Sequence, residues 1–161
     1  MKKNFVLLAS LVVSLSLFFA KPALAGDQEA DEVRAAAGKF YTALNALFVG
    51  DGTSMLEVWS HRDDITYMGP MGGRCLGWKA VRAMWEEQTA LKLGGQVRAE
   101  EMLITVSGDL AVINNFEVGE NLNVNGQLEK VNIRATNVFR KENGDWKMIG
   151  HHTDLLPLLA K

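Results

Sequence analysis

The stretch from Val131 to Asp154, which reads VNIRATNVFRKENGDWKMIGHHTD, carries the strongest structural pattern in this chain. In its first half, apolar and polar residues alternate, as they do in a strand that buries one face. The dipeptide Asn143-Gly144 in the middle is typical of a tight turn between two strands. The residues after the turn then run back along the first strand. The stretch therefore predicts a long β-hairpin.

Asn137 interrupts an apolar row on the first of these strands. Because side chains alternate across a strand, it shares its face with four apolar residues: Val131, Ile133, Ala135 and Phe139. A buried amide needs a hydrogen-bonding partner, which can be another side chain, a water molecule or a ligand. Asn137 is therefore either a satisfied core amide or part of the floor of a pocket.

Residues 1–25 have the pattern of a secretory signal peptide. Lys2 and Lys3 precede an apolar run over residues 5–20, and Ala23 and Ala25 stand at the spacing of a cleavage site. No later segment reaches the roughly 18 consecutive apolar residues that a membrane span requires. The sequence predicts a periplasmic or secreted protein whose mature part, residues 26–161, is one domain without membrane attachment after cleavage.

The charge and the cysteine content exclude some classes of partner. Removing residues 1–25 takes away three of the 17 basic residues and none of the 19 acidic ones, so the formal charge changes from −2 to −5. The remaining basic residues are scattered, which argues against a nucleic-acid partner. Cys75 is the single cysteine, so no intrachain disulfide can form. We interpret it as a small packed residue rather than a nucleophile.

Helical periodicity comes first in the mature chain, and strand periodicity follows. The expected helices begin at Asp27 or Asp31, at Thr53 or Ser54, and at Gly77; they end near Gly50, near Trp59 and at Leu91. The expected strands are a short one through Ile65 and Tyr67, two long ones over Val97–Val106 and Leu110–Glu120, and the two strands of the hairpin. This order predicts an α+β fold with helices on one face of a curved, mostly antiparallel sheet.

Several short motifs recur in the order known from one group of proteins. They are Phe40-Tyr41-Thr42-Ala43-Leu44-Asn45, Asp64-Ile65-Thr66-Tyr67, Gly69-Pro70, Gly77, Gly108-Asp109-Leu110-Ala111, Arg134-Ala135-Thr136 and Asn143-Gly144-Asp145-Trp146-Lys147 with His152 beyond. On these motifs the chain resembles the nuclear transport factor 2-like superfamily, in its SnoaL-like and ketosteroid-isomerase-like branch. The resemblance implies a cone-shaped half-barrel, with three N-terminal helices packed on the concave face of the sheet. It also implies a pocket between them and commonly a homodimer through the convex face, but no single reaction.

Strand parity then predicts which side chains line the pocket. If Ile65 and Tyr67 point inward, and the apolar members of the other strands do so too, the polar lining consists of Tyr41, Tyr67, Asn114, Asn137 and His152. Three tryptophans on helical stripes would supply apolar walls: Trp59, Trp78 and Trp85. Such a pocket suits a small hydrophobic or flat organic molecule held by few polar groups. No cofactor is expected.

The ketosteroid isomerases of this superfamily place a tyrosine and an acid across the pocket from a carboxylate base. Tyr41 matches the tyrosine, Asn137 stands at the position of the acid, and the position of the base falls on Gly69. Without the base, that activity is not expected. His152 is the best substitute acid or base, although a histidine bonded to backbone or to Asp154 is the simpler interpretation.

A metal site is not expected. His151 and His152 are neighbours on a strand and point to opposite faces, so they cannot easily bind one ion, even with His61 nearby.

Three functional hypotheses stay open at this point. The first is an exported protein that binds a small apolar molecule without changing it. The second is a lyase, isomerase or cyclase that uses His152 with Tyr41, Tyr67 and Asn137. The third is a non-catalytic dimerisation module, in which the tryptophans fill the pocket.

Overall fold

The computed structural model describes residues 25–70, 72–123 and 125–154. Its helices are α1 (Ala25–Phe48), α2 (Thr53–Val58) and α3 (Trp78–Leu91). Its strands are β1 (Thr66–Met68), β2 (Cys75–Leu76), β3 (Gln96–Ser107), β4 (Leu110–Leu122), β5 (Leu128–Glu142) and β6 (Asp145–Asp154). The predicted signal peptide and the C-terminal residues 155–161 lie outside the described ranges, apart from Ala25. In the ranges that are described, no helix is both long and apolar enough to cross a membrane.

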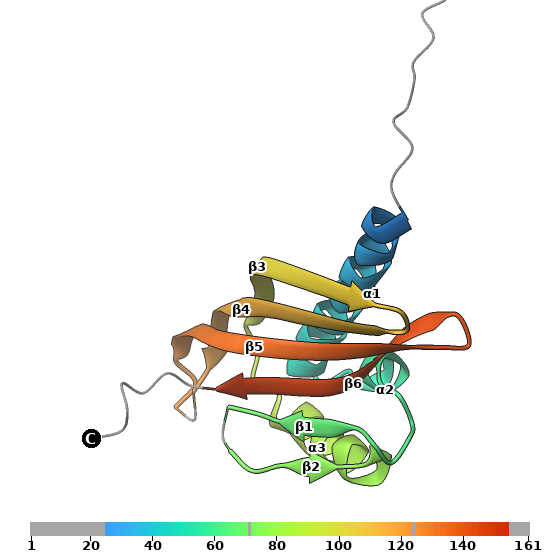
Figure 1. The fold of residues 1–161 in the computed structure, drawn as a ribbon. Helices are drawn as coiled ribbons and strands as arrows, with labels where there is room; N and C mark the ends of the chain where they lie inside the picture. Colours follow the sequence, from blue (N-terminus) through green and yellow to red (C-terminus); the bar gives the residue numbers. More distant parts are fainter. Residues whose placement is uncertain (1–24, 71, 124, 155–161) are drawn as a thin grey trace, which may run out of the picture.

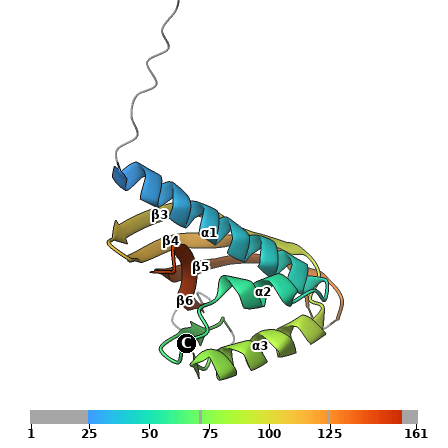
Figure 2. The same ribbon diagram turned by 90° about the vertical axis from the view of Figure 1, so that its right-hand side faces the viewer.

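The six strands form one curved sheet in the order β2-β1-β6-β5-β4-β3 (Figure 1). Neighbouring strands are antiparallel except β1 and β6, which are parallel. All three helices lie on one side of this sheet (Figure 2), and the core fills the space between the two layers. The predicted α+β class is therefore confirmed. The short strand β2 before α3 was not predicted.

The β5–β6 hairpin confirms the interpretation of the stretch from Val131 to Asp154. Asn143 and Gly144 at its turn have φ angles of 52° and 90°. Positive φ at both central residues gives the turn a twist that matches the flanking strands. Asn-Gly is the dipeptide that adopts this geometry at the lowest cost, which explains why the chain reverses there.

A β-bulge in β6 changes which of its residues face the helices. Phe139 pairs with Met148 and Val138 pairs with Gly150, so Ile149 is the extra residue of the bulge. Before the bulge Met148 points into the core; after it, His151 points inward opposite Asn137. The prediction that His152 faces the pocket is therefore wrong. It assumed that inward and outward residues alternate along the whole strand, and the bulge breaks this alternation.

In β4 the inward row is also the opposite of the predicted one. The buried residues are Ala111, Ile113, Asn115 and Glu117, whereas Val112, Asn114 and Phe116 are exposed on the outer face. Both rows contain apolar residues, so hydrophobic alternation could not distinguish them. The apolar residues of the exposed row lie on the convex side of the sheet, and polar residues of the buried row lie on the concave side.

Candidate functional site

A cavity of about 530 Å³ opens between the concave face of the sheet and the helices α1 and α3. We call it the central cavity. Its walls are mainly apolar, from Leu44, Phe48, Trp85, Leu93, Val97, Val131 and Ile133. Its buried inner end holds four polar residues: Tyr67, Glu117, His151 and Thr153. Its outer end is lined by residues that include the exposed Glu129, Lys130 and Asn132. The volume is in the range of sites for small organic molecules.

A hydrogen-bonded group of five buried side chains forms the inner end of the central cavity and the layer behind it. The polar cluster, as we name it, consists of Tyr41 from α1, Asn115 and Glu117 from β4, Asn137 from β5 and His151 from β6. Their strands are neighbours in the sheet, and their positions fall on its inward face. The sheet register and the packing of α1 against the sheet therefore bring together residues that are far apart in sequence.

The hydrogen bonds within the polar cluster show which group donates and which accepts each hydrogen. The Asn137 Nδ2 group donates to Asn115 Oδ1 at 2.9 Å and to the Tyr41 hydroxyl at 3.3 Å. Asn115 Nδ2 donates to the same hydroxyl at 2.9 Å. With both lone pairs of its oxygen occupied, the Tyr41 hydroxyl donates its hydrogen to Glu117 Oε1 at 3.2 Å.

The same pattern assigns the tautomer of His151. Because Asn137 uses its Nδ2 group as a donor, its Oδ1 atom accepts, and it lies 2.6 Å from His151 Nδ1. The hydrogen of the neutral imidazole is therefore on Nδ1, and Nε2 carries a free lone pair. This Nε2 atom lies 3.8 Å from Glu117 Oε1. A proton acceptor and a carboxyl group thus stand side by side at the inner end of the central cavity.

Burial changes the proton affinity of both groups. It raises the pKa of Glu117 to about 7, and the hydrogen bond from Tyr41 opposes the shift only partly. Burial, with the neighbouring His152, lowers the pKa of His151 to about 3, so the imidazole is neutral. Burial and the adjacent Glu117 raise the pKa of Tyr41, which stays a neutral donor. A carboxyl group that exchanges its proton near neutral pH is suited to general acid–base chemistry.

The raised pKa of Glu117 predicts a pH-dependent stability. The folded protein holds this proton up to about pH 7, whereas the unfolded chain releases it near its usual value of 4.5. Its contribution is therefore complete below pH 4.5 and is lost as pH rises through 7. Compared with Glu117→Gln, the wild-type free energy of unfolding should fall by about 3 kcal/mol between pH 4.5 and 8 in denaturant titrations.

The His151 imidazole changes the free energy of unfolding at lower pH and with the opposite sign. Its lowered pKa costs stability as pH falls from 6.5 towards 3, in the wild type and in Glu117→Gln alike. The difference between the two proteins therefore isolates Glu117. An equal pH dependence of both proteins above pH 5 would show that Glu117 ionises normally in the folded state.

The structure places some of the sequence-predicted site residues at the central cavity. Tyr67 and Trp85 line it. The Tyr67 ring stacks on His151 with centroids 5.6 Å apart, and burial raises the pKa of Tyr67 to about 12. Tyr41 and Asn137 do not line the cavity themselves but belong to the polar cluster. Trp59 does not line the cavity either, and it is buried against Trp85 with ring centroids 6.1 Å apart. Their roles in ligand binding remain predictions.

Three other predicted residues lie outside this site. His152 is exposed and lines a shallow depression on the outer face of the sheet, near Arg134 and Asp154. Asn114 is exposed on the same face, where its amide donates to Thr136 at 3.0 Å. Trp78 stacks on His61 at 4.0 Å instead of lining the central cavity. The first two corrections follow from the inverted parity of β6 and β4. The third arises because Trp78 is the first residue of α3, whereas the cavity is lined by the later part of this helix and by Leu93 beyond its end.

The resemblance to the ketosteroid isomerases placed their base at Gly69. A side chain there would collide with the Tyr67 hydroxyl, which occupies the space above Gly69. Gln88 Nε2 holds this hydroxyl in place with a bond of 3.0 Å. Tyr67 therefore fills the volume that a carboxylate on residue 69 would need, and the buried carboxyl group comes from Glu117 on another strand.

Sequence reasoning missed Glu117, Asn115 and His151. One signal was present: three polar residues, Asn114, Asn115 and Glu117, interrupt the otherwise apolar run of residues 110–118. The choice between the faces required the register with β5, in which Asn115 pairs with Ala135 and Glu117 pairs with Ile133. The inward face of β4 is therefore determined by its pairing with a distant segment of the chain, and it cannot be read from the sequence of the strand alone.

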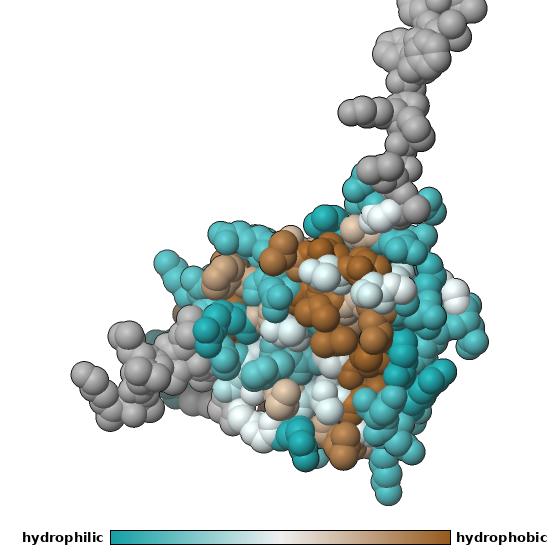
Figure 3. All heavy atoms as spheres, viewed as in Figure 1, coloured by the Kyte–Doolittle hydropathy of each residue, from teal (hydrophilic) through white to brown (hydrophobic). Residues whose placement is uncertain are grey.

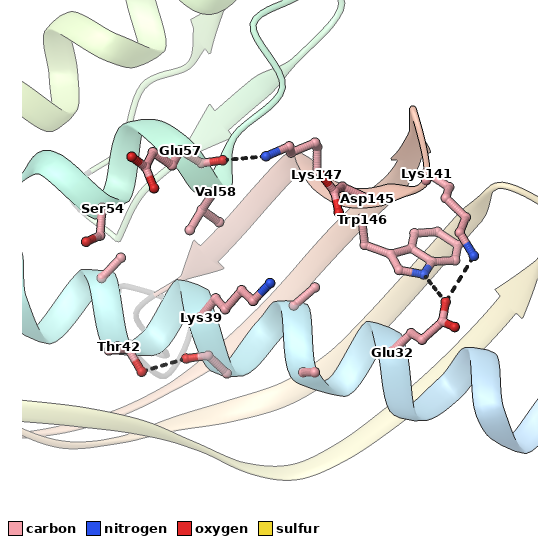
Figure 4. A pocket seen from close by; sticks show the side chains of 15 residues that line it. Glu32, Lys39, Thr42, Ser54, Glu57, Val58, Lys141, Asp145, Trp146 and Lys147 are labelled. Carbon is pink, nitrogen blue, oxygen red and sulfur yellow. Dashed lines mark hydrogen bonds and ion pairs between the residues drawn. The ribbon is translucent and has the colours of Figure 1, made fainter.

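A second depression, of about 840 Å³, lies between α1, α2 and the β5–β6 turn (Figure 4). Three of its charged side chains, those of Glu32, Lys141 and Lys147, already have partners. Glu32 accepts from Lys141 Nζ at 3.0 Å and from the Trp146 ring nitrogen at 3.3 Å, while Lys147 Nζ donates to the Glu57 carbonyl at 2.9 Å. The described residues around this groove form no buried polar cluster, and the central cavity is the better candidate for a functional site.

Comparisons with known proteins agree with this fold. A family model described as SnoaL-like domain matches residues 33–155. A proposed dehydratase of the NTF2-like family from Streptomyces avermitilis is 23% identical, with a TM-score of 0.71 over 81% of this chain and 97% of that chain. An NTF2-like superfamily protein from Salmonella enterica serovar Typhimurium is 16% identical, with a TM-score of 0.71 over 81% and 92%. The comparison with curated proteins finds no match.

A third similar structure is a proposed calcium/calmodulin-dependent protein kinase type II association domain from Thiobacillus denitrificans. It is 26% identical, with a TM-score of 0.61 over 76% of this chain and 94% of that chain. The names of these structures differ widely, so the likeness establishes the fold rather than one activity. Since the family model spans most of the chain, this protein belongs to the SnoaL-like family within the NTF2-like superfamily.

Proposed function

We propose that the protein binds a small apolar organic molecule in the central cavity and moves a proton to or from it with Glu117. One observation carries this proposal: a buried carboxyl group with a pKa of about 7 lines a mainly apolar cavity beside a neutral imidazole. Proton transfer of this kind is needed by isomerases and by dehydratases alike. The likeness to a proposed dehydratase supports this class of reaction without identifying the substrate.

The hydrogen bonds of the polar cluster suggest which residue transfers the proton and which residues position it. Glu117 Oε1 accepts the Tyr41 hydrogen bond, and among the described residues no hydrogen bond to its Oε2 atom is found. In its ionised form, Glu117 removes a proton from a carbon next to a carbonyl group; the C–H bond breaks, an O–H bond forms, and the electron pair moves onto the carbonyl oxygen. The same proton can then return to the molecule. Tyr41 and Asn137 are positioning residues, because they orient Glu117 and His151 through hydrogen bonds.

Hydrogen exchange of a simple ketone tests this proposal. The purified protein is incubated in D₂O with 1-tetralone, and incorporation of deuterium next to the carbonyl is followed by mass spectrometry. We expect exchange faster than in buffer, rising with pH to a plateau above about pH 7, because Glu117 acts as the base. Bound 1-tetralone with no acceleration at any pH would contradict proton transfer.

A ligand-binding protein without a reaction is the second candidate. It is favoured by the polar cluster, in which the bonds of Tyr41, Asn115 and Asn137 are directed at one another. Such a network also stabilises a rigid pocket floor without any catalysis. Saturable binding of 1-tetralone with unaccelerated exchange in the experiment above would favour this candidate.

We also propose that the protein is exported. The support is the sequence of residues 1–25, with Lys2 and Lys3 before the apolar run and Ala25 at the cleavage spacing. N-terminal sequencing of the protein from its native cells should give a first residue near Gly26. A retained Met1 would contradict export by this route.

A homodimer through the convex face of the sheet is proposed as well. Apolar side chains gather on this face over β3 and β4 (Figure 3), and they include Leu103, Leu110, Val112 and Phe116. Exposed apolar patches on a sheet commonly mark an interface. Phe116→Lys should shift the protein from dimer to monomer in light scattering, because it introduces a charge into this patch. Leu91→Lys, at an equally apolar position that is exposed at the end of α3, is the control and should leave the mass unchanged.

A further inference from the structure

His151 Nε2 is a hydrogen-bond acceptor at the inner end of the central cavity. The hydrogen of this imidazole is on Nδ1, which lies 2.6 Å from Asn137 Oδ1, so Nε2 carries a lone pair. Among the described residues no group donates a hydrogen bond to Nε2, and the nearby Glu117 Oε1 is 3.8 Å away. A buried acceptor without a partner costs free energy, so we expect a water molecule or a ligand to supply the hydrogen.

This acceptor is open to the central cavity. In the described part of the chain, the fully enclosed side-chain atoms without a partner are Trp59 Nε1, Trp85 Nε1 and Thr153 Oγ1. His151 Nε2 and Glu117 Oε2 also lack a described partner, but they are not among these enclosed atoms. Their side chains keep 4% and 6% of their surface exposed, and both residues line the cavity. A ligand in the cavity can therefore reach both groups.

The surroundings of the imidazole hold it in one orientation. It packs against the ring of Phe40, with centroids 5.0 Å apart, and against the ring of Tyr67, with centroids 5.6 Å apart. The hydrogen bond from Nδ1 to Asn137 fixes its tilt and its tautomer. An acceptor that is already oriented binds a donor at a low cost in conformational entropy. His151 can therefore distinguish a ligand that has a hydrogen to donate from one that has none.

The group that fits between His151 and Glu117 is an uncharged hydroxyl. The distance of 3.8 Å is too long for a direct hydrogen bond, but one oxygen atom can lie about 2.8 Å from both side chains. Below pH 7 Glu117 is a neutral acid that donates, whereas His151 stays a neutral acceptor. A hydroxyl oxygen accepts one hydrogen and donates another. A carboxylate has no hydrogen for His151, and an ammonium group has no lone pair for Glu117.

We propose that His151 Nε2 accepts a hydrogen bond from a hydroxyl group of the ligand, and that the same hydroxyl accepts a hydrogen bond from Glu117. The ligand is an uncharged ring compound with an alcohol or phenol group, because the walls of the central cavity are mainly apolar. The inference rests on the proposed function in taking this cavity as the ligand site and Glu117 as its acid. It adds the residue that selects the ligand and the group that is selected.

Equilibrium dialysis at pH 6.0 with 2-naphthol and 2-methoxynaphthalene tests the inference. Both probes carry an oxygen at the same position, but only 2-naphthol has a hydrogen to donate. We expect 2-naphthol to bind about five- to tenfold more tightly, the value of one hydrogen bond. His151→Phe keeps a ring without an acceptor, so it should abolish this preference. His152→Phe makes the same change at the neighbouring residue, on the outer face of the sheet, and should retain it.

A spectroscopic measurement tests the same contact in the wild-type protein. The chain has three histidines, so the ¹⁵N spectrum of histidine-labelled protein can be assigned with His61→Phe and His152→Phe. The Nε2 signal of His151 should shift to lower frequency when 2-naphthol is added, because the lone pair then accepts a hydrogen bond from the phenol. Addition of 2-methoxynaphthalene should cause no such shift.

Four results would overturn the inference: no binding of either probe at millimolar concentration, equal affinities of the two probes, a preference for 2-naphthol that persists in His151→Phe, or an unchanged Nε2 signal at saturating 2-naphthol. Thermal unfolding shows whether His151→Phe is folded; if it is not, the ¹⁵N spectrum of the wild type decides.

Failure of the proposed function is a separate result, because it is measured by deuterium exchange into 1-tetralone. A preference for 2-naphthol that depends on His151, without exchange, would leave a binding protein with the inferred contact. Exchange without this preference would leave the reaction and remove the contact.

Discussion

Replacing Glu117 with glutamine is expected to slow deuterium exchange into 1-tetralone by about 10² to 10⁴, the usual contribution of a general base. Glutamine has nearly the same shape and can still accept the hydrogen bond from the Tyr41 hydroxyl through its amide oxygen. Its amide cannot act as the base, so the rise of the exchange rate to a plateau above pH 7 should also disappear. The measurement is the initial rate of exchange at saturating 1-tetralone, with the affinity for the ketone determined separately.

Two matched variants control this experiment. Glu129→Gln makes the same chemical change at the exposed outer end of the central cavity and should retain the wild-type rate. His152→Ala should also retain it, because His152 lies on the outer face of the sheet. An unchanged rate in Glu117→Gln, or a large loss in His152→Ala, would contradict the assignment of Glu117 and return His152 to consideration.

Asn137→Leu is expected to lower the free energy of unfolding by about 3 kcal/mol, because three buried groups lose their partner at about 1 kcal/mol or more each. Asn137 donates to the Tyr41 hydroxyl and to Asn115 Oδ1, and it accepts from His151 Nδ1. Leucine has the same number and branching of side-chain heavy atoms, so the substitution leaves no cavity behind. Denaturant titration measures it, and the melting temperature should fall by roughly 10 °C.

Asn114→Leu is the control for this change. Asn114 lies next to the inward row of the same sheet but points outward, where it donates to Thr136. Surface substitutions of this kind usually change stability by less than about 0.5 kcal/mol. Equal destabilisation by both substitutions would mean that the loss reflects the strand position and not the polar cluster.

Much of the fold could be predicted from local patterns. The hairpin was recognisable because the alternation and the Asn143-Gly144 turn act within a few residues of the chain. The three helices could be recognised from their apolar stripes, although α1 begins at Ala25, earlier than predicted. Tyr41 and Asn137 were identified as polar residues within buried rows, and the structure places both of them in the polar cluster.

The chemical centre of the site could not be predicted in the same way. The prediction placed Asn114 and His152 inward and so missed Glu117 and His151, because β4 is apolar on both faces and β6 contains a bulge at Ile149. A shift of one residue exchanges the two faces of a strand, so a single bulge moved the inward position from His152 to its neighbour. The position of the bulge depends on the pairing of Phe139 with Met148 across the hairpin.

The sequence by itself determined the order of helices and strands, the reversal at Asn143-Gly144 and the burial of Asn137, because these properties follow from interactions between near neighbours in the chain. The tertiary structure alone decided which acid and which histidine line the central cavity: Glu117 and His151. Their orientation depends on the register of β4, β5 and β6 and on the packing of that sheet against the helices. Those contacts join segments that are distant in sequence, and no local pattern encodes them.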